Sequence, residues 1–83
     1  MTRVKKRDGS EEDFIREKIV TAIVKTGGKL EPARRIASDI EKKYSSRSTV
    51  STEEIRKDVL DRLMKEDEST YNSWLENEKK KRR

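Results

Sequence analysis

Residues 4–18 read V-K-K-R-D-G-S-E-E-D-F-I-R-E-K and depart from the charged-helix composition of the rest of the chain. The basic run leads into Asp8 and Gly9, a pair favoured in two-residue hairpin turns, because both central residues of a type I′ turn adopt a positive φ. Opposite charges that face each other across the strands contribute roughly 0.2–1 kcal/mol per pair. We therefore predict an N-terminal β-hairpin, in which the facing residues are Arg7 and Ser10, Lys6 and Glu11, and Lys5 and Glu12.

Helices are predicted after the hairpin, which needs a packed support because an isolated two-stranded hairpin is marginal in water. Apolar residues at helical spacing predict a first helix over about residues 16–26, which ends at Gly27 and Gly28 because glycine suits a left-handed cap. The second helix opens at Glu31 and Pro32, since the missing N–H of proline costs nothing at the first helical position. Residues 45–49 are expected to form a polar connection to the third helix.

The third helix is predicted to begin with a capping box of Ser51 and Glu54. A fourth helix follows the acidic residues 66–68, whose charge suits a helix N-terminus. The residues expected on the apolar faces of the four helices are, in order, Ile15, Ile19, Ala22 and Ile23; Ala33, Ile36, Ala37, Ile40 and Tyr44; Ile55, Val59, Leu60, Leu63 and Met64; and Tyr71, Trp74 and Leu75. The predicted fold class is α+β, with a β-hairpin packed on a small bundle of about four helices.

The composition bounds the class of protein. Eighty-three residues make one small domain, and the hydrophobic fraction of 29% against 47% charged leaves a thin core. The chain has 22 basic and 17 acidic side chains, and five of the basic ones are residues 79–83, so residues 1–78 are neutral overall. We predict one domain over residues 1–78 and a flexible basic tail over residues 79–83. Without cysteine there is no disulfide framework or zinc ribbon, and no apolar run approaches the ~20 residues of a membrane span, so we expect a cytoplasmic protein without a membrane partner.

The pattern V-x-K-R-D-G, followed by a bulky apolar residue five positions after the glycine and then by K-I, resembles the ATP-cone. This family is a regulatory nucleotide-binding module, found at the N-terminus of many ribonucleotide reductase large subunits and in the bacterial repressor of their genes. The matching residues are Val4, Lys6, Arg7, Asp8, Gly9, Phe14, Lys18 and Ile19. The resemblance covers about residues 3–75 and is looser at V-S-T-E-E-I (residues 50–55), Tyr71 and Trp74. It implies the same architecture, a small β element over a helical bundle.

The resemblance also implies a nucleotide, ATP or dATP with or without Mg²⁺, between the hairpin and the bundle. Three apolar residues would line the adenine slot: Val4, Phe14 and Ile19. Three cations would meet the ribose and the phosphates: Lys6, Arg7 and Lys18. Glu12 would accept a hydrogen bond from the adenine amino group, and Thr52 would donate to a phosphate at the start of the third helix, where free N–H groups also favour an anion. Arg56, one turn later, presents a fork that can hold a phosphate bidentately.

Each of these residues also has a plainer interpretation. The three apolar residues suit an ordinary core, and the cations suit a solvated surface. Thr52 suits a helix N-cap. Tyr71 and Trp74 are more simply core or interface aromatics, and Ile15 stands where some members of the family have a polar residue that helps to read the base.

Nothing in the sequence predicts an enzyme, because histidine and cysteine are absent and no G-x-x-x-x-G-K-[ST] phosphate loop is present. We expect a module that senses ATP or dATP and couples occupancy to self-association or to binding of a protein partner in trans. The alternative is a small nucleic-acid-binding protein or transcription regulator that uses the basic tail. The chain carries no reductase catalytic domain, which leaves open whether it is a free-standing module or a piece of a larger protein.

Overall fold

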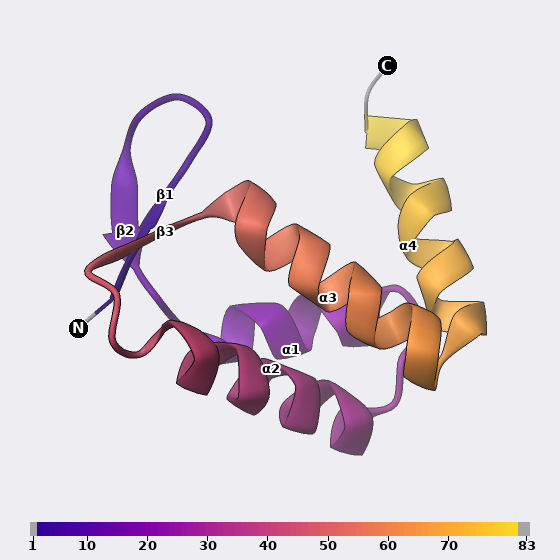
Figure 1. Ribbon diagram of the computed structural model, residues 1–83. Helices are drawn as coiled ribbons and strands as arrows, with labels where there is room; N and C mark the ends of the chain where they lie inside the picture. Colours follow the sequence, from indigo (N-terminus) through magenta and orange to yellow (C-terminus); the bar gives the residue numbers. More distant parts are fainter. Residues whose placement is uncertain (1, 82–83) are drawn as a thin grey trace.

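A computed structural model describes residues 2–81, which form one three-stranded sheet and four helices (Figure 1). The elements in chain order are β1 (Arg3–Lys5), β2 (Glu11–Asp13), α1 (Arg16–Lys25), α2 (Leu30–Tyr44), β3 (Thr49–Ser51), α3 (Thr52–Glu66) and α4 (Glu68–Lys81). In the sheet, β1 lies between an antiparallel β2 and a parallel β3. The α+β class and the hairpin on four helices are confirmed.

The register of the hairpin is one residue away from the predicted one. Lys5 faces Glu11, and Glu12 lies opposite Val4. The loop has three residues, because the Lys6 N–H donates to the Ser10 carbonyl at 2.8 Å and the Gly9 N–H donates to the Lys6 carbonyl at 3.0 Å. Only Gly9 of this loop has a positive φ, +88°, which is the pattern of a type I turn followed by one left-handed residue.

Asp8 explains why the longer loop forms. Its carboxylate accepts hydrogen bonds from the Ser10 backbone N–H at 2.9 Å and from the Ser10 hydroxyl at 2.6 Å. Such a local bond is the usual way in which aspartate stabilises a turn without a positive φ of its own. The predicted two-residue turn, which needs a positive φ at Asp8, is therefore wrong.

β3 is a strand that the sequence analysis missed. Thr49, expected in a polar connection, begins this strand, and Val50 pairs with Val4 of β1. Val50 is almost completely buried, and the Arg3 N–H donates to the Ser48 carbonyl at 2.9 Å beside it. The hairpin is thus tied to the segment that leads into α3.

The helix ends largely follow the prediction. Gly27 ends α1 with a φ of +101°. α2 begins at Leu30, earlier than predicted, and Pro32 is its third residue. Its first backbone bond is from the Ala33 N–H to the Lys29 carbonyl, so the missing N–H of Pro32 still costs nothing. The capping box at the start of α3 is confirmed.

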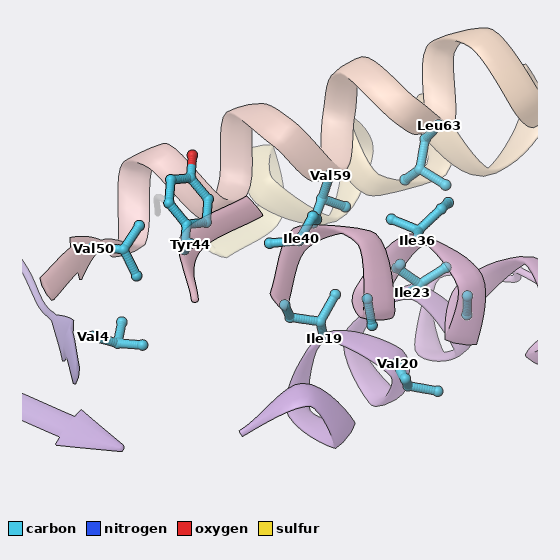
Figure 2. Packing of buried hydrophobic residues seen from close by; sticks show 12 residues of the cluster. Val4, Ile19, Val20, Ile23, Ile36, Ile40, Tyr44, Val50, Val59 and Leu63 are labelled. Atoms are coloured by element: carbon cyan, nitrogen blue, oxygen red, sulfur yellow. The ribbon is translucent and has the colours of Figure 1, made fainter. Parts of the chain in front are cut away.

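The core lies between α1, α2, α3 and the inner side of the sheet (Figure 2). Its members are Val4, Ile19, Val20, Ile23, Ala33, Ile36, Ala37, Ile40, Tyr44, Val50, Val59 and Leu63. Two residues predicted on apolar faces are exposed instead: Ile15 precedes the first turn of α1, and Met64 lies on the outer side of α3. Over residues 68–80 of α4, one residue, Thr70, is buried, while Tyr71 and Trp74 are partly buried against the core.

The described helices include none that is long and apolar enough to cross a membrane.

Candidate functional site

A cavity of about 210 Å³ opens between the sheet, α1, α3 and Trp74 of α4. Seven of the nine residues predicted to bind a nucleotide line it: Val4, Glu12, Phe14, Lys18, Ile19, Thr52 and Arg56. They come from four different elements and from the segment after β2. The structure therefore brings together side chains that are up to 52 positions apart in the sequence, from Val4 to Arg56.

The apolar wall of the cavity is an extension of the core. Val4 points inward from the middle of β1, and Ile19 is buried on α1. Phe14 is held at the end of the hairpin, where its backbone N–H donates to the Thr2 carbonyl at 3.1 Å, and its ring packs partly against the core. Val4 and Ile19 are core residues and Phe14 packs against the core, and all three also line the cavity, so the two interpretations of the sequence are compatible.

Glu12 lies at the edge of the cavity between two ammonium groups. One oxygen of its carboxylate is 3.2 Å from Lys6 Nζ and 3.1 Å from Lys18 Nζ. The hydrogen bond from Lys18, and then that from Lys6, lowers the pKa of Glu12 below its ordinary value. The carboxylate therefore stays ionised at neutral pH and can accept a hydrogen bond from a ligand.

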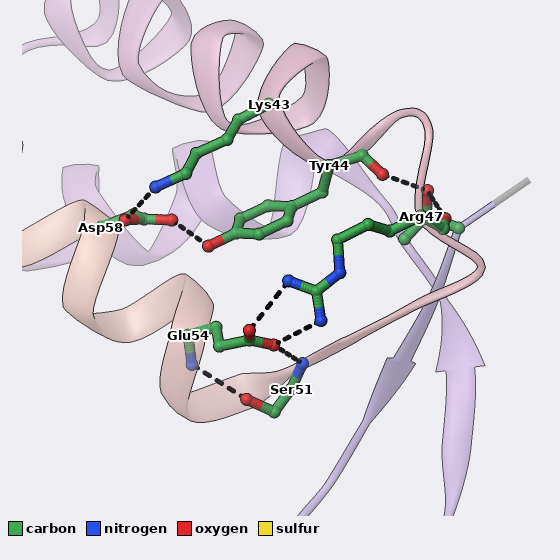
Figure 3. Close-up of polar contacts among 7 residues, drawn as sticks. Lys43, Tyr44, Arg47, Ser51, Glu54 and Asp58 are labelled. Atoms are coloured by element: carbon green, nitrogen blue, oxygen red, sulfur yellow. Dashed lines mark hydrogen bonds and ion pairs between the residues drawn. The ribbon is translucent and has the colours of Figure 1, made fainter.

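The first turn of α3 is fixed by a polar cluster on the side of the helix toward α2 (Figure 3). Glu54 accepts the Ser51 N–H at 2.8 Å, the Ser51 hydroxyl accepts the Glu54 N–H at 3.0 Å, and Arg47 donates twice to Glu54 at 2.8 and 3.2 Å. These bonds, that from Arg47 first, lower the pKa of Glu54 to about 2. The N-terminus of α3 is thus held in place beside the cavity.

The two polar residues of α3 that line the cavity are Thr52 and Arg56. Thr52 is the first residue of the helix, and its hydroxyl donates to the Lys5 carbonyl at 3.3 Å. Arg56, one turn later, donates from Nε and from one terminal nitrogen to the two oxygens of Glu78, at 2.5 and 2.6 Å. This pairing raises the pKa of Arg56 above its ordinary value.

The two remaining predicted residues, Lys6 and Arg7, do not line the cavity. Lys6 follows β1 and reaches Glu12, while Arg7 lies in the hairpin loop and donates from Nε to Glu53 of α3 at 2.9 Å. Arg7 is largely exposed. All four predicted phosphate-binding cations of the chain are therefore paired with carboxylates: Lys6 and Lys18 with Glu12, Arg7 with Glu53, and Arg56 with Glu78.

Comparison with known families decides the class of module. A family model described as the ATP cone domain matches residues 2–73, which is most of the chain. The chain belongs to the ATP-cone family. A search of curated proteins finds no match. As an ATP-cone, the chain is a nucleotide-binding regulatory module, and the family's role is regulatory rather than catalytic.

The ATP-cone cavity also contains residues that sequence reasoning did not assign to it. Trp74 and Ile55 are the main ones, and Trp74 was interpreted as a core or interface aromatic. The indole Nε1 of Trp74 is buried without a hydrogen-bond partner among the described residues. No local signal places Trp74 at this cavity, because its position depends on how α4 packs against α3. Among residues 2–81, no cluster of three or more acidic side chains is arranged to hold a metal ion.

Proposed function

We propose that this ATP-cone binds ATP or dATP with the adenine in the cavity and the phosphates along its charged edge. One observation carries the proposal: an apolar slot and its neighbouring cations are formed by the same residues that carry the family pattern. Typical small-molecule pockets measure about 300–1,000 Å³. The smaller volume of about 210 Å³ suits the base and part of the sugar, so the phosphates would lie outside it.

The chemistry of the lining supports these roles. Phe14 and Ile19 offer flat and apolar contacts to a base, and the ionised Glu12 can accept from the adenine amino group. Lys18, Arg56 and the free N–H groups at the start of α3 lie where an anion would be stabilised. Lys6 and Arg7 reach the same edge from the hairpin. Any Mg²⁺ would arrive with the phosphates and be held mainly by them and by water.

Calorimetric titration with ATP tests the site. We expect Lys18→Ala to weaken ATP binding by about 1.5–3 kcal/mol, the range for a hydrogen bond to a charged group. Lys25→Ala is the matched control, because it removes the same charge from the same helix outside the cavity, and it should leave the affinity almost unchanged. Equal losses in the two variants would mean that ATP responds only to overall charge, and the absence of binding to the parent chain would refute the proposal.

We further propose that occupancy changes how the chain associates with a second copy or with a protein partner. The support is α4, which exposes part of an aromatic surface and shares Trp74 with the cavity wall. If α4 can adopt two positions, a ligand that contacts Trp74 favours the position in which the chain binds that ligand more tightly. Sedimentation at matched protein concentrations, without nucleotide and with saturating ATP or dATP, should show different mass distributions. Identical distributions would refute coupling to self-association and leave a partner in trans to be tested by pull-down with and without ATP.

A further inference from the structure

The contact between Arg56 and Glu78 joins the cavity to the C-terminal part of α4. It is bidentate, and it is more shielded than the other cation–carboxylate pairs at this edge: the Arg56 side chain is 30% exposed and that of Glu78 is 28% exposed, against 71% for Arg7. The two partners are 22 residues apart and lie on different helices. A guanidinium binds a carboxylate and a phosphate through the same planar fork, so Glu78 occupies the donors of Arg56 that a phosphate would use.

Every predicted phosphate-binding cation at the edge of the cavity has a carboxylate partner before any ligand arrives. Lys6 and Lys18 share Glu12, Arg7 pairs with Glu53, and Arg56 pairs with Glu78. A polyphosphate brings several negative charges to cations whose charge these three carboxylates already largely offset. It can gain full hydrogen bonds from the cations only where a carboxylate gives way, because a like charge beside the phosphate disfavours binding.

Of the three carboxylates, Glu78 is on the least anchored element. Glu12 lies on β2, and Glu53 lies in the first turn of α3, which the capping box fixes. In contrast, the contacts of α4 with the core come from its first two turns, where Thr70 is buried and Tyr71 and Trp74 are partly buried. Among residues 76–80, all side chains except that of Glu78 are exposed. The last turns of α4 can therefore move without disturbing the core.

We propose that Glu78 is a latch that competes with the polyphosphate of the ligand for Arg56, so that nucleotide binding releases the C-terminal turns of α4 from α3. The inference rests on the proposed nucleotide site and supplies the physical link between that site and α4. Adenosine, which has no phosphate, would fill the cavity and leave the latch closed. The state of α4 would then report the presence of phosphates and not of the base alone.

Calorimetric titration of two isosteric variants with ATP and with adenosine tests the latch. Glu78→Gln should bind ATP about fivefold or more tightly than the parent chain, the lower end of typical coupling between two sites. Glu76→Gln is the matched control, because it removes the same charge from the same helix, where Glu76 is exposed and lies 3.8 Å from Lys79. It should change the affinity less than about twofold, and adenosine should bind the parent chain and both variants alike.

A double-variant cycle shows whether Glu78 acts through Arg56. In an Arg56→Ala background, Glu78→Gln should no longer affect ATP binding. Backbone relaxation by NMR should show residues 76–80 becoming more mobile when ATP, but not adenosine, is added to the parent chain.

Any one of three results would refute the latch and leave the nucleotide site standing. Glu78→Gln and Glu76→Gln could bind ATP equally, or the effect of Glu78→Gln could survive in the Arg56→Ala background. The third such result is that residues 76–80 do not change in mobility when ATP is added. If no variant and no parent chain binds ATP, the proposed function itself fails, and the latch fails with it.

Discussion

Arg7 and Arg3 lie close together in the chain but on different parts of the hairpin. Arg7 is in the loop and donates to Glu53 of α3, whereas Arg3 lies on β1 with its side chain toward Asp13, at 2.6 Å, and away from the inward-pointing Val4. Both arginines are exposed, and such pairs contribute little to stability. Neither lines the cavity, but Arg7 pairs with the first turn of α3, beside the proposed phosphate position, whereas Arg3 pairs within the hairpin.

This pair of arginines gives a matched test of the hairpin. Arg7→Ala should weaken ATP binding by about 1.5–3 kcal/mol, because a charge-assisted bond to a phosphate is lost, and should leave adenosine binding unchanged. Arg3→Ala should affect neither ligand. Calorimetry with the two ligands makes the comparison. Equal ATP affinities of the two variants would show that the hairpin loop does not reach the phosphates.

Single residues also show where sequence reasoning stops. Val4, Phe14, Lys18 and Ile19 were identifiable because their spacing matches a known pattern, and the structure brings them to one cavity. The facing residues of the hairpin were wrong because Asp8 favours a loop that is one residue longer. A shift of one residue moves side chains to the other face of a strand, so this small error changes which charges meet.

The start of α3 is the element on which the cavity depends most, since Thr52 and Arg56 are placed by it. Its capping box was readable from Ser51 and Glu54, which are close in sequence. β3, the strand directly before α3, could not be predicted from the sequence, because Val50 is its single apolar residue and its partner β1 lies more than 40 positions away. Local patterns predicted the helices well, and pairing between distant segments escaped them.

Acid should destabilise this helix start. The folded chain holds the pKa of Glu54 at about 2, below the ordinary value of 4.5, so the ionised form stabilises the fold above pH 4.5. That contribution is lost as the pH falls from about 4.5 towards 2. Urea unfolding across this range should show a smaller loss of stability in Glu54→Gln than in the parent chain. Glu31→Gln, a change at an exposed position of α2, is the control and should lose stability as the parent chain does. If Glu54→Gln also lost as much stability as the parent chain over this pH range, the stabilising role of ionised Glu54 would be contradicted.

The basic end of the chain is partly helical. Lys79, Lys80 and Lys81 belong to the last turn of α4, while residues 82 and 83 lie outside the described part of the chain. The flexibility expected for residues 79–83 stays a prediction, as does their attraction to nucleic acid. The five cations give the chain its whole net charge of +5.

Replacing residues 79–83 by glutamine distinguishes DNA binding at the basic end of the chain from ATP binding at the cavity. Binding to DNA, followed by fluorescence anisotropy at low and moderate salt, should be strongly reduced, because cations that release counterions from the phosphates are removed. ATP binding should stay within about twofold of the parent chain, because the proposed site interacts with other residues. A large loss of ATP affinity would show instead that Lys79 or Lys80 reaches the phosphates.

At the scale of the whole molecule, the fold is thin, with principal extents of 33 × 31 × 17 Å and one core shared by three helices and the sheet. The predicted class and helix order were correct because charge, capping and periodicity agree along the chain. The position of α4 was beyond prediction, and with it the places of Trp74 and Glu78, since it depends on packing between helices. The features proposed to link nucleotide to association lie in this least predictable part.

Amide NMR titration with ATP tests the nucleotide site most directly, because it reports binding and its location together. We expect the largest shift changes to cluster around the cavity, at Val4, Phe14, Lys18, Ile19 and Thr52, with smaller changes on the outer face of α2. Inorganic triphosphate should perturb Lys18 and Thr52 and spare Phe14. Changes confined to residues 79–81, as expected for a polyanion attracted to a basic helix end, or no changes at all, would contradict the proposed site.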